Sequence, residues 1–97
     1  MRIEYAPSAQ GDLLEIGDHY REVGGNQLAR RMVKQIRSDI KALLDYTAPP
    51  YEMVPGVRRL VVAGGAYLAF HRVTESAIEI LHIRRSERIP ATSSDME

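Results

Sequence analysis

Hydrophobic residues follow a helical repeat in the first half of the chain. Residues 2–5 predict a short strand, which ends before Pro7. Apolar residues then recur at helical spacing in two stretches: Ala9, Leu13, Ile16 and Tyr20, and then Ala29, Met32, Val33, Ile36, Ile40, Leu43 and Leu44. The second stretch predicts a helix over residues 27–45. Because only residues 23–26 link the two helices, we expect them to pack as antiparallel neighbours.

Two residues predict details of the first helix. Ser8 stands where an N-cap belongs, just before the apolar stripe begins. Gly17 lies inside the stripe, where glycine lowers helix propensity by about 1 kcal/mol relative to alanine. We therefore expect Gly17 to mark a close approach of a neighbouring backbone.

The second half of the chain predicts strands. Residues 46–56 read as a loop, because Pro49, Pro50 and Pro55 interrupt regular structure. Apolar runs over 57–63 and 67–73 flank a Gly-Gly pair, which is typical of a hairpin, and residues 77–83 form a third run. The element order β-α-α-β-β-β predicts an α+β fold, with an N-terminal helical hairpin packed on one face of a small antiparallel sheet. We expect one domain over residues 1–88 and a flexible C-terminal tail over 89–97.

Two-residue turns would fix which side chains share each face of this sheet. They set Val62 opposite Tyr67, Val73 opposite Ile78 and Ala69 opposite His82. The face away from the helices would then carry a group of apolar residues: Val61, Leu68, Phe70, Leu81 and Ile83. It would also carry Arg59, with Arg72 opposite Glu79 as a favourable cross-strand pair. One helical hairpin covers one face, so we expect this apolar face to bind a partner. The alternatives are that the first strand and the tail cover it, or that a turn has slipped.

Composition narrows the function classes. The chain has 97 residues, 13 basic and 13 acidic residues and no cysteine. Zero net charge argues against a general polyanion-binding surface, and the lack of cysteine excludes disulfides and thiolate metal sites. Three scattered histidines make a zinc site improbable. With no apolar membrane span and no signal peptide, we expect a cytoplasmic protein without a metal or a cofactor.

The charges are nevertheless segregated along the chain. Residues 1–22 hold five acidic and two basic residues, whereas residues 27–45 hold five basic and two acidic ones. Residues 57–88 hold six arginines against three glutamates. Arginine suits recognition surfaces because its planar head binds carboxylate and phosphate at two points. Codon usage combined with solvated faces is the alternative explanation.

No motif of a known reaction type is present. A metal-independent ribonuclease needs basic groups to hold the scissile phosphate, together with a proton donor and acceptor. The set closest to this requirement is Arg59, Arg72, His82 and Arg85. A half-buried strand histidine with a backbone partner is the plainer interpretation of His82. We assign structural roles to a further group: Arg58, Tyr67 and His71.

Four segments together resemble the ParE/RelE superfamily of bacterial toxin–antitoxin toxins. They span residues 6–16 (APSAQGDLLEI), 56–62 (GVRRLVV), 67–73 (YLAFHRV) and 78–85 (IEILHIRR). The resemblance covers about residues 2–88 and implies the β-α-α-β-β-β fold. It also implies an antitoxin from the same operon, whose C-terminal segment wraps over the toxin. The overlay assigns the apolar sheet face to that antitoxin.

The resemblance also bears on the target. RelE-like members cleave mRNA on the ribosome with basic residues on one sheet face, and those positions fall near Arg59, Val61, Leu68 and residues 85–86. Val61 and Leu68 carry no charge, so the chain looks more like the ParE branch, whose members inhibit DNA gyrase by binding it. We therefore expect a gyrase inhibitor in a hetero-oligomeric complex with a ParD-like or similar antitoxin, without membrane association or sequence-specific nucleic-acid binding. Its charged, target-binding rim would comprise Arg59, Arg72, Arg84, Arg85 and Arg88. The alternatives are a RelE-like mRNA endonuclease that uses Arg59, Arg72, His82 and Arg85, and a family member without toxicity.

Overall fold

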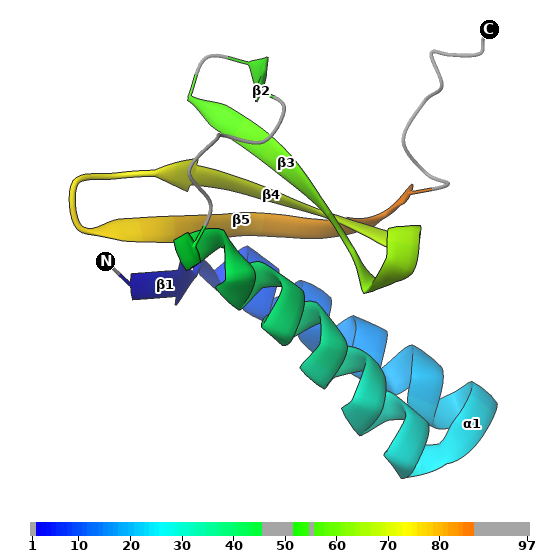
Figure 1. Cartoon of the computed structure of the whole chain (residues 1–97). Helices are drawn as coiled ribbons and strands as arrows, with labels where there is room; N and C mark the ends of the chain where they lie inside the picture. The colour runs from blue at the N-terminus through cyan, green and yellow to red at the C-terminus, as the bar shows by residue number, and fades with distance from the viewer. Residues whose placement is uncertain (1, 46–51, 55, 87–97) are drawn as a thin grey trace, which may run out of the picture.

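The fold has two layers, a helical layer and a β-sheet, as Figure 1 shows. This computed structural model describes residues 2–45, 52–54 (backbone alone) and 56–86. The elements run in the following order: β1 (Arg2–Tyr5), α1 (Pro7–Lys41), the 3-10 helix η1 (Ala42–Asp45), β2 (Glu52–Val54), β3 (Val57–Val62), the 3-10 turn η2 (Ala63–Gly65), β4 (Tyr67–Val73) and β5 (Ala77–Arg85). The predicted loop over 46–56 thus contains a short strand, β2. The predicted tail lies outside the described residues.

α1 folds back on itself at Gly25, which divides it into a first arm (residues 7–24) and a second arm (residues 26–41). Gly25 has φ +88° and ψ 177°, a conformation that glycine adopts readily and other residues avoid. The two arms correspond to the two predicted antiparallel helices. The helix starts earlier than predicted, because Pro7 suits the first helical position and extended Ala6 precedes it. Ser8 is therefore inside the helix, and its hydroxyl donates to the carbonyl of Leu81 (2.8 Å).

The strands form one sheet in the order β1-β5-β4-β3-β2. β1 pairs with β5 in parallel, so the sheet is mixed, whereas every other pairing is antiparallel. Both predicted turns are confirmed, because Val62 pairs with Tyr67 and Val73 pairs with Ile78. The pairing of Arg72 with Glu79 is confirmed as well, with a 2.7 Å bond between the side chains.

A β-bulge changes the register in the second half of β5. The pairing shifts between Phe70 and His71, so that Phe70 pairs with His82 and Ala69 with Ile83. The predicted pairing of Ala69 with His82 is therefore wrong. An extra residue in one strand exchanges the faces of every side chain beyond it. As a result Ile83 enters the core, where it is 3% exposed, and His82 moves to the opposite face.

The core lies between α1 and the face of the sheet that packs against it, which we call the inner face. It is built from aliphatic side chains of both arms and of the three central strands, and Ile36, Ile40 and Ile80 are fully buried. The arms pack against each other at Gly17. A Cβ atom there would lie 3.6 Å from Cγ2 of Val33, which is an ordinary contact with a side chain, so the predicted close approach of a neighbouring backbone is wrong.

Candidate functional site

The sheet face turned away from α1, which we call the outer face, carries apolar and charged side chains together. Strand pairing places the following residues of its central part there: Arg59, Val61, Leu68, Phe70, Arg72, Glu79, His82 and Arg84. Val61 is 59% exposed and Phe70 is partly buried. Leu68, in contrast, is only 5% exposed, so the expectation of a uniformly uncovered apolar face is wrong. The accessible part is a small apolar centre bordered by cations.

The bulge accounts for the difference between this surface and the predicted one. Ile83 belongs to the core, and Leu81 is the residue without a partner at the bulge, where it is partly buried. In their place His82 pairs with Phe70, and Arg84 pairs with Leu68. The outer face is therefore less apolar than predicted, and Arg85, predicted for its rim, lies on the inner side instead. Arg88, predicted for the same rim, lies outside the described residues.

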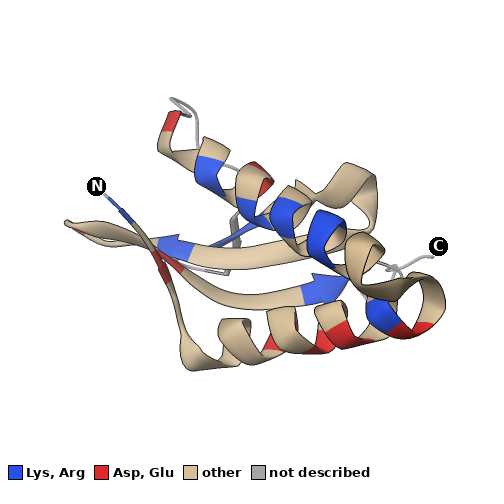
Figure 2. Cartoon of the chain, turned by 90° about the horizontal axis from the view of Figure 1, so that it is seen from below, with Lys and Arg blue, Asp and Glu red and all other residues tan. Residues whose placement is uncertain are grey.

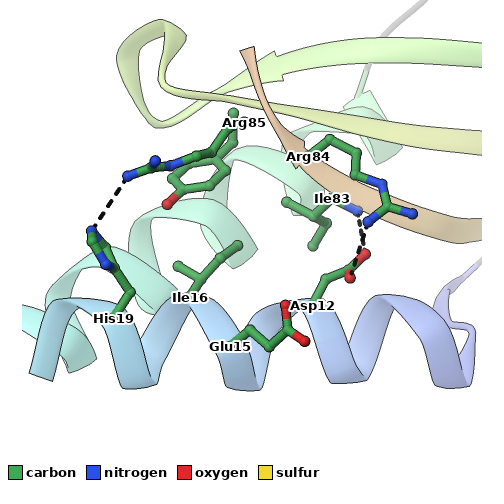
Figure 3. A pocket seen from close by; sticks show the side chains of 8 residues that line it. Asp12, Glu15, Ile16, His19, Ile83, Arg84 and Arg85 are labelled. Carbon is green, nitrogen blue, oxygen red and sulfur yellow. Dashed lines mark hydrogen bonds and ion pairs between the residues drawn. The ribbon is translucent and has the colours of Figure 1, made fainter. Parts of the chain in front are cut away.

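Asp12 fixes the C-terminal half of β5 to the first arm. β1 ends at Tyr5, opposite Ile80, so no strand of the described part of the chain pairs with β5 on this side beyond that point. The Asp12 carboxylate accepts the backbone N–H of Ile83 (2.9 Å), as Figure 3 shows. The same carboxylate lies 3.5 Å from Nδ1 of His82 and 3.8 Å from Nη1 of Arg84. Asp12 therefore gives a backbone amide at the open edge of β5 its hydrogen-bond partner, and it lies close to two side chains of the outer face.

Asp12 was missed as a site residue by the sequence analysis, which gave no signal for it. Asp12 and Ile83 are 71 positions apart, and the bond joins a side chain to a backbone amide, which no residue pattern records.

A cleft of about 220 Å³ opens between the first arm and the end of β5. It is lined by Asp12, Glu15, Ile16, His19, Tyr67, Ile83, Arg84 and Arg85. Arg85 comes from the inner side of the sheet, where it pairs with Tyr67, and its Nη2 lies 3.4 Å from Nε2 of His19. Acidic and basic groups are mixed here, so the cleft has no single charge that would select a phosphate or a carboxylate.

The alternative catalytic set does not converge as a whole. Arg59, Arg72 and His82 share the outer face, but Arg85 lies on the inner side. The head of Arg72 is held by Glu79. The set therefore lacks one member on the face where the others lie.

Tyr67 and His71 point into the core. Tyr67 is 3% exposed, and burial raises the pKa of its hydroxyl, as does the hydrogen bond with Tyr20 (3.4 Å). His71 is 1% exposed, and burial lowers its pKa; a contact with the Ala69 carbonyl (3.3 Å) opposes this shift and the charge of Arg58 adds to it. Nε2 of His71 has no hydrogen-bond partner among the described residues. His71 is therefore closed to a substrate, and Tyr67 borders the cleft but is almost fully buried.

Neither a metal site nor a membrane-spanning helix is found among the residues that the structure describes. No group of three or more histidine, aspartate or glutamate side chains in this part of the chain could hold a metal ion. None of its helices is both long enough and apolar enough to cross a membrane.

A helical hairpin on one face of a small sheet, with a charged and partly apolar surface on the other, defines a small two-layer α+β domain. The family model for the ParE toxin of the type II toxin–antitoxin system parDE matches residues 3–90, and the chain belongs to this family. A solved structure described as the chromosomal ParDE TA system from P. aeruginosa is similar, with a TM-score of 0.77 and 33% sequence identity. The match covers 88% of this chain and 95% of that one. No curated protein matches the chain. The chain is thus a toxin of the type II class.

Proposed function

We propose that this toxin inhibits DNA gyrase by binding it, and that an antitoxin encoded beside it neutralises it by covering the outer face. The ParE family membership supports both parts, as does the similar ParDE structure. The antitoxin and the toxin would then act as a hetero-oligomeric complex in the cytoplasm.

The observation that carries the antitoxin proposal is the chemistry of the outer face. An apolar centre at Val61 and Phe70 is bordered by Arg59, Arg72 and Arg84. A segment with apolar anchors and acidic flanks complements both features, because apolar contact supplies affinity and opposite charge favours encounter and orientation. The expected partner is therefore an acidic, partly apolar stretch of the antitoxin.

The first experiment tests whether the antitoxin binds the outer face. Val61→Asp puts a charge at an exposed position in the apolar centre, so the toxin should remain folded and bind the adjacent operon product at least tenfold more weakly. Val23→Asp is the matched control, because Val23 is 63% exposed on the first arm, away from the sheet. Calorimetric titration of both variants measures the effect. Equal affinity of Val61→Asp and wild type would reject the assignment of this face.

The second experiment tests the target. Induction of the toxin alone should produce filamentous cells and the SOS response, and the purified toxin should inhibit supercoiling by gyrase while mRNA stays intact. An inactive result in the supercoiling assay, with toxicity retained, would reject gyrase as the target.

One observation favours a second candidate, a RelE-like mRNA endonuclease. The bulge brings His82 and Arg84 onto the same face as Arg59, which is closer to a phosphate-binding surface than the sequence predicted. Cuts at codon-defined positions in mRNA on translating ribosomes, lost in His82→Gln, would select this candidate over gyrase inhibition. A growth assay without any defect would instead indicate a family member without toxicity.

A further inference from the structure

Four basic side chains line a groove of about 530 Å³ between the two arms of α1. Arg21 comes from the first arm, and Arg30, Lys34 and Arg37 come from the second. All four are exposed, and no acidic residue is among those that line the groove. Within the described part of the chain only Arg21 has an ion-pair partner, which is Asp18. The groove therefore suits an anionic ligand, which arginine side chains can hold at two points.

Three of these cations belong to a continuous basic stripe along the second arm. The stripe consists of four exposed residues at spacings of four, three and four positions: Arg30, Lys34, Arg37 and Lys41. This spacing places them on one side of the helix, within about 60° of one another. Figure 2 shows blue segments in succession along this arm. At a rise of about 1.5 Å per residue the stripe extends over about 17 Å.

The acidic residues nearby are turned away from the basic stripe. Asp39 lies nine positions after Arg30, which places it on the opposite side of the arm, and its carboxylate accepts the backbone N–H of Ala63 (2.8 Å). On the first arm, Glu15 lines the cleft beside β5, and Glu22 follows two turns later on the same side. The stripe therefore keeps a positive potential, although the chain as a whole has no net charge.

The length of the basic stripe fits a nucleic-acid duplex better than a small anion or a single strand. Phosphates of one strand of B-DNA follow at about 3.4 Å along the helix axis, so about five of them would face the stripe. A small anion would engage only one or two of its cations. Single-strand sites add aromatic rings on which bases stack, but Tyr5, beside the stripe, is covered by Arg37, whose guanidinium lies 4.9 Å from the ring centre.

We propose that the basic stripe, with Arg21 across the groove, binds the phosphate backbone of duplex DNA without reading its sequence. Contacts to phosphate hold a protein on a duplex and carry no sequence information. The choice of DNA over RNA rests on the proposed function, because gyrase acts on DNA. The groove belongs to the helical layer and the outer face lies on the far side of the sheet (Figure 1), so the toxin can contact DNA while a protein covers its outer face.

Fluorescence anisotropy with a labelled DNA duplex of about 24 base pairs and arbitrary sequence tests the proposal. In about 50 mM salt the toxin should bind with micromolar affinity, and a duplex of shuffled sequence should bind equally well. The logarithm of the binding constant should fall with the logarithm of the salt concentration with a slope of about −4, as expected for four or five phosphate contacts. Arg30→Gln with Lys34→Gln should weaken binding at least tenfold and reduce this slope by about 2.

A matched pair of single variants separates the basic stripe from general charge effects. Lys34→Gln and Arg2→Gln each remove one exposed positive charge, but Arg2 lies on β1, outside the stripe. Lys34→Gln should weaken binding several-fold and Arg2→Gln should leave it unchanged, with circular dichroism as the check that both are folded. Equal losses in the two variants would overturn the proposal. Loss of binding in Arg59→Gln, with the stripe variants unaffected, would move the DNA to the outer face and overturn it as well.

Three further outcomes would also overturn the proposal. The first is a wild-type toxin that fails to bind the duplex at about 0.1 mM protein, where non-specific DNA binding is normally seen. The second is a tenfold preference for an RNA duplex of the same length. The third is a designed acidic amphipathic peptide that binds the groove at least tenfold more tightly than DNA, which would make the groove a protein-binding site.

The assay contains no gyrase, so its outcome is separate from that of the supercoiling test. A toxin that inhibits supercoiling but does not bind the free duplex would reject the role of the basic stripe and leave gyrase as the target. A toxin that binds the duplex through the stripe but does not inhibit supercoiling would reject the target and leave the DNA contact.

Discussion

Replacement of Asp12 by alanine should destabilise the toxin strongly, because the carboxylate satisfies a backbone amide at an open strand edge. The Asp12 side chain is 13% exposed and its bond to the N–H of Ile83 measures 2.9 Å. A hydrogen bond to a charged group contributes about 1.5–3 kcal/mol, and loss of the acceptor also leaves a partly buried amide without a partner. The contacts with His82 and Arg84 add less, since both side chains are substantially exposed and solvent screens them.

We therefore expect Asp12→Ala to lower the free energy of unfolding by about 2 kcal/mol. In a domain of this size that corresponds to a Tm lower by about 10 °C. Asp12→Asn retains an acceptor oxygen and should lose about half as much stability. Urea unfolding followed by circular dichroism measures both changes, and hydrogen exchange should show faster exchange of the Ile83 amide in the alanine variant.

Asp18→Ala is the control for this measurement. Asp18 lies two turns further along the same arm and forms an exposed ion pair with Arg21, so its loss should change stability by less than about 0.5 kcal/mol. If the two alanine variants were equally stable, or if the Ile83 amide stayed protected in Asp12→Ala, the anchoring role of Asp12 would be refuted.

Three further predictions concern stability. Because burial lowers the pKa of folded His71 below its usual value of 6.5, the unfolded chain binds a proton first as the pH falls. The free energy of unfolding should therefore decrease as the pH falls below about 6.5. Denaturant unfolding at a series of pH values should show a weaker dependence in His71→Phe, and an equal dependence in the two proteins would contradict this. Gly17→Ala should raise the free energy of unfolding by up to about 1 kcal/mol, because the added Cβ makes an ordinary contact and helix propensity improves. Thermal unfolding measures this, and a lower Tm would mean that the arms cannot accept the methyl group. A double-mutant cycle on Arg72 and Glu79 should give less than about 1 kcal/mol of coupling, because the pair is exposed; a larger value would contradict this.

The predicted outer face shows where sequence reasoning held and where it ended. Val61, Phe70 and Arg59 lie where the turn-derived register put them, because a hairpin turn fixes pairing for the residues close to it. Ile83 and His82 exchange faces because a bulge lies between them and the turn. No local pattern marks that bulge, which places an isoleucine in the core in place of a histidine.

The sequence by itself determined the two helical arms, the fold-back near Gly25, the three antiparallel strands and the turns that join them. Hydrophobic periodicity and turn chemistry act between residues close in the chain, so the sequence displays them directly. The tertiary structure alone decided the parallel position of β1 beside β5, the bulge at Leu81 and the anchoring of β5 by Asp12. The position of β1 and the anchoring by Asp12 depend on contacts between residues about 70 positions apart, and the bulge depends on which side chains the core buries. At these places packing of the core and hydrogen bonding of backbone amides outweigh local preference.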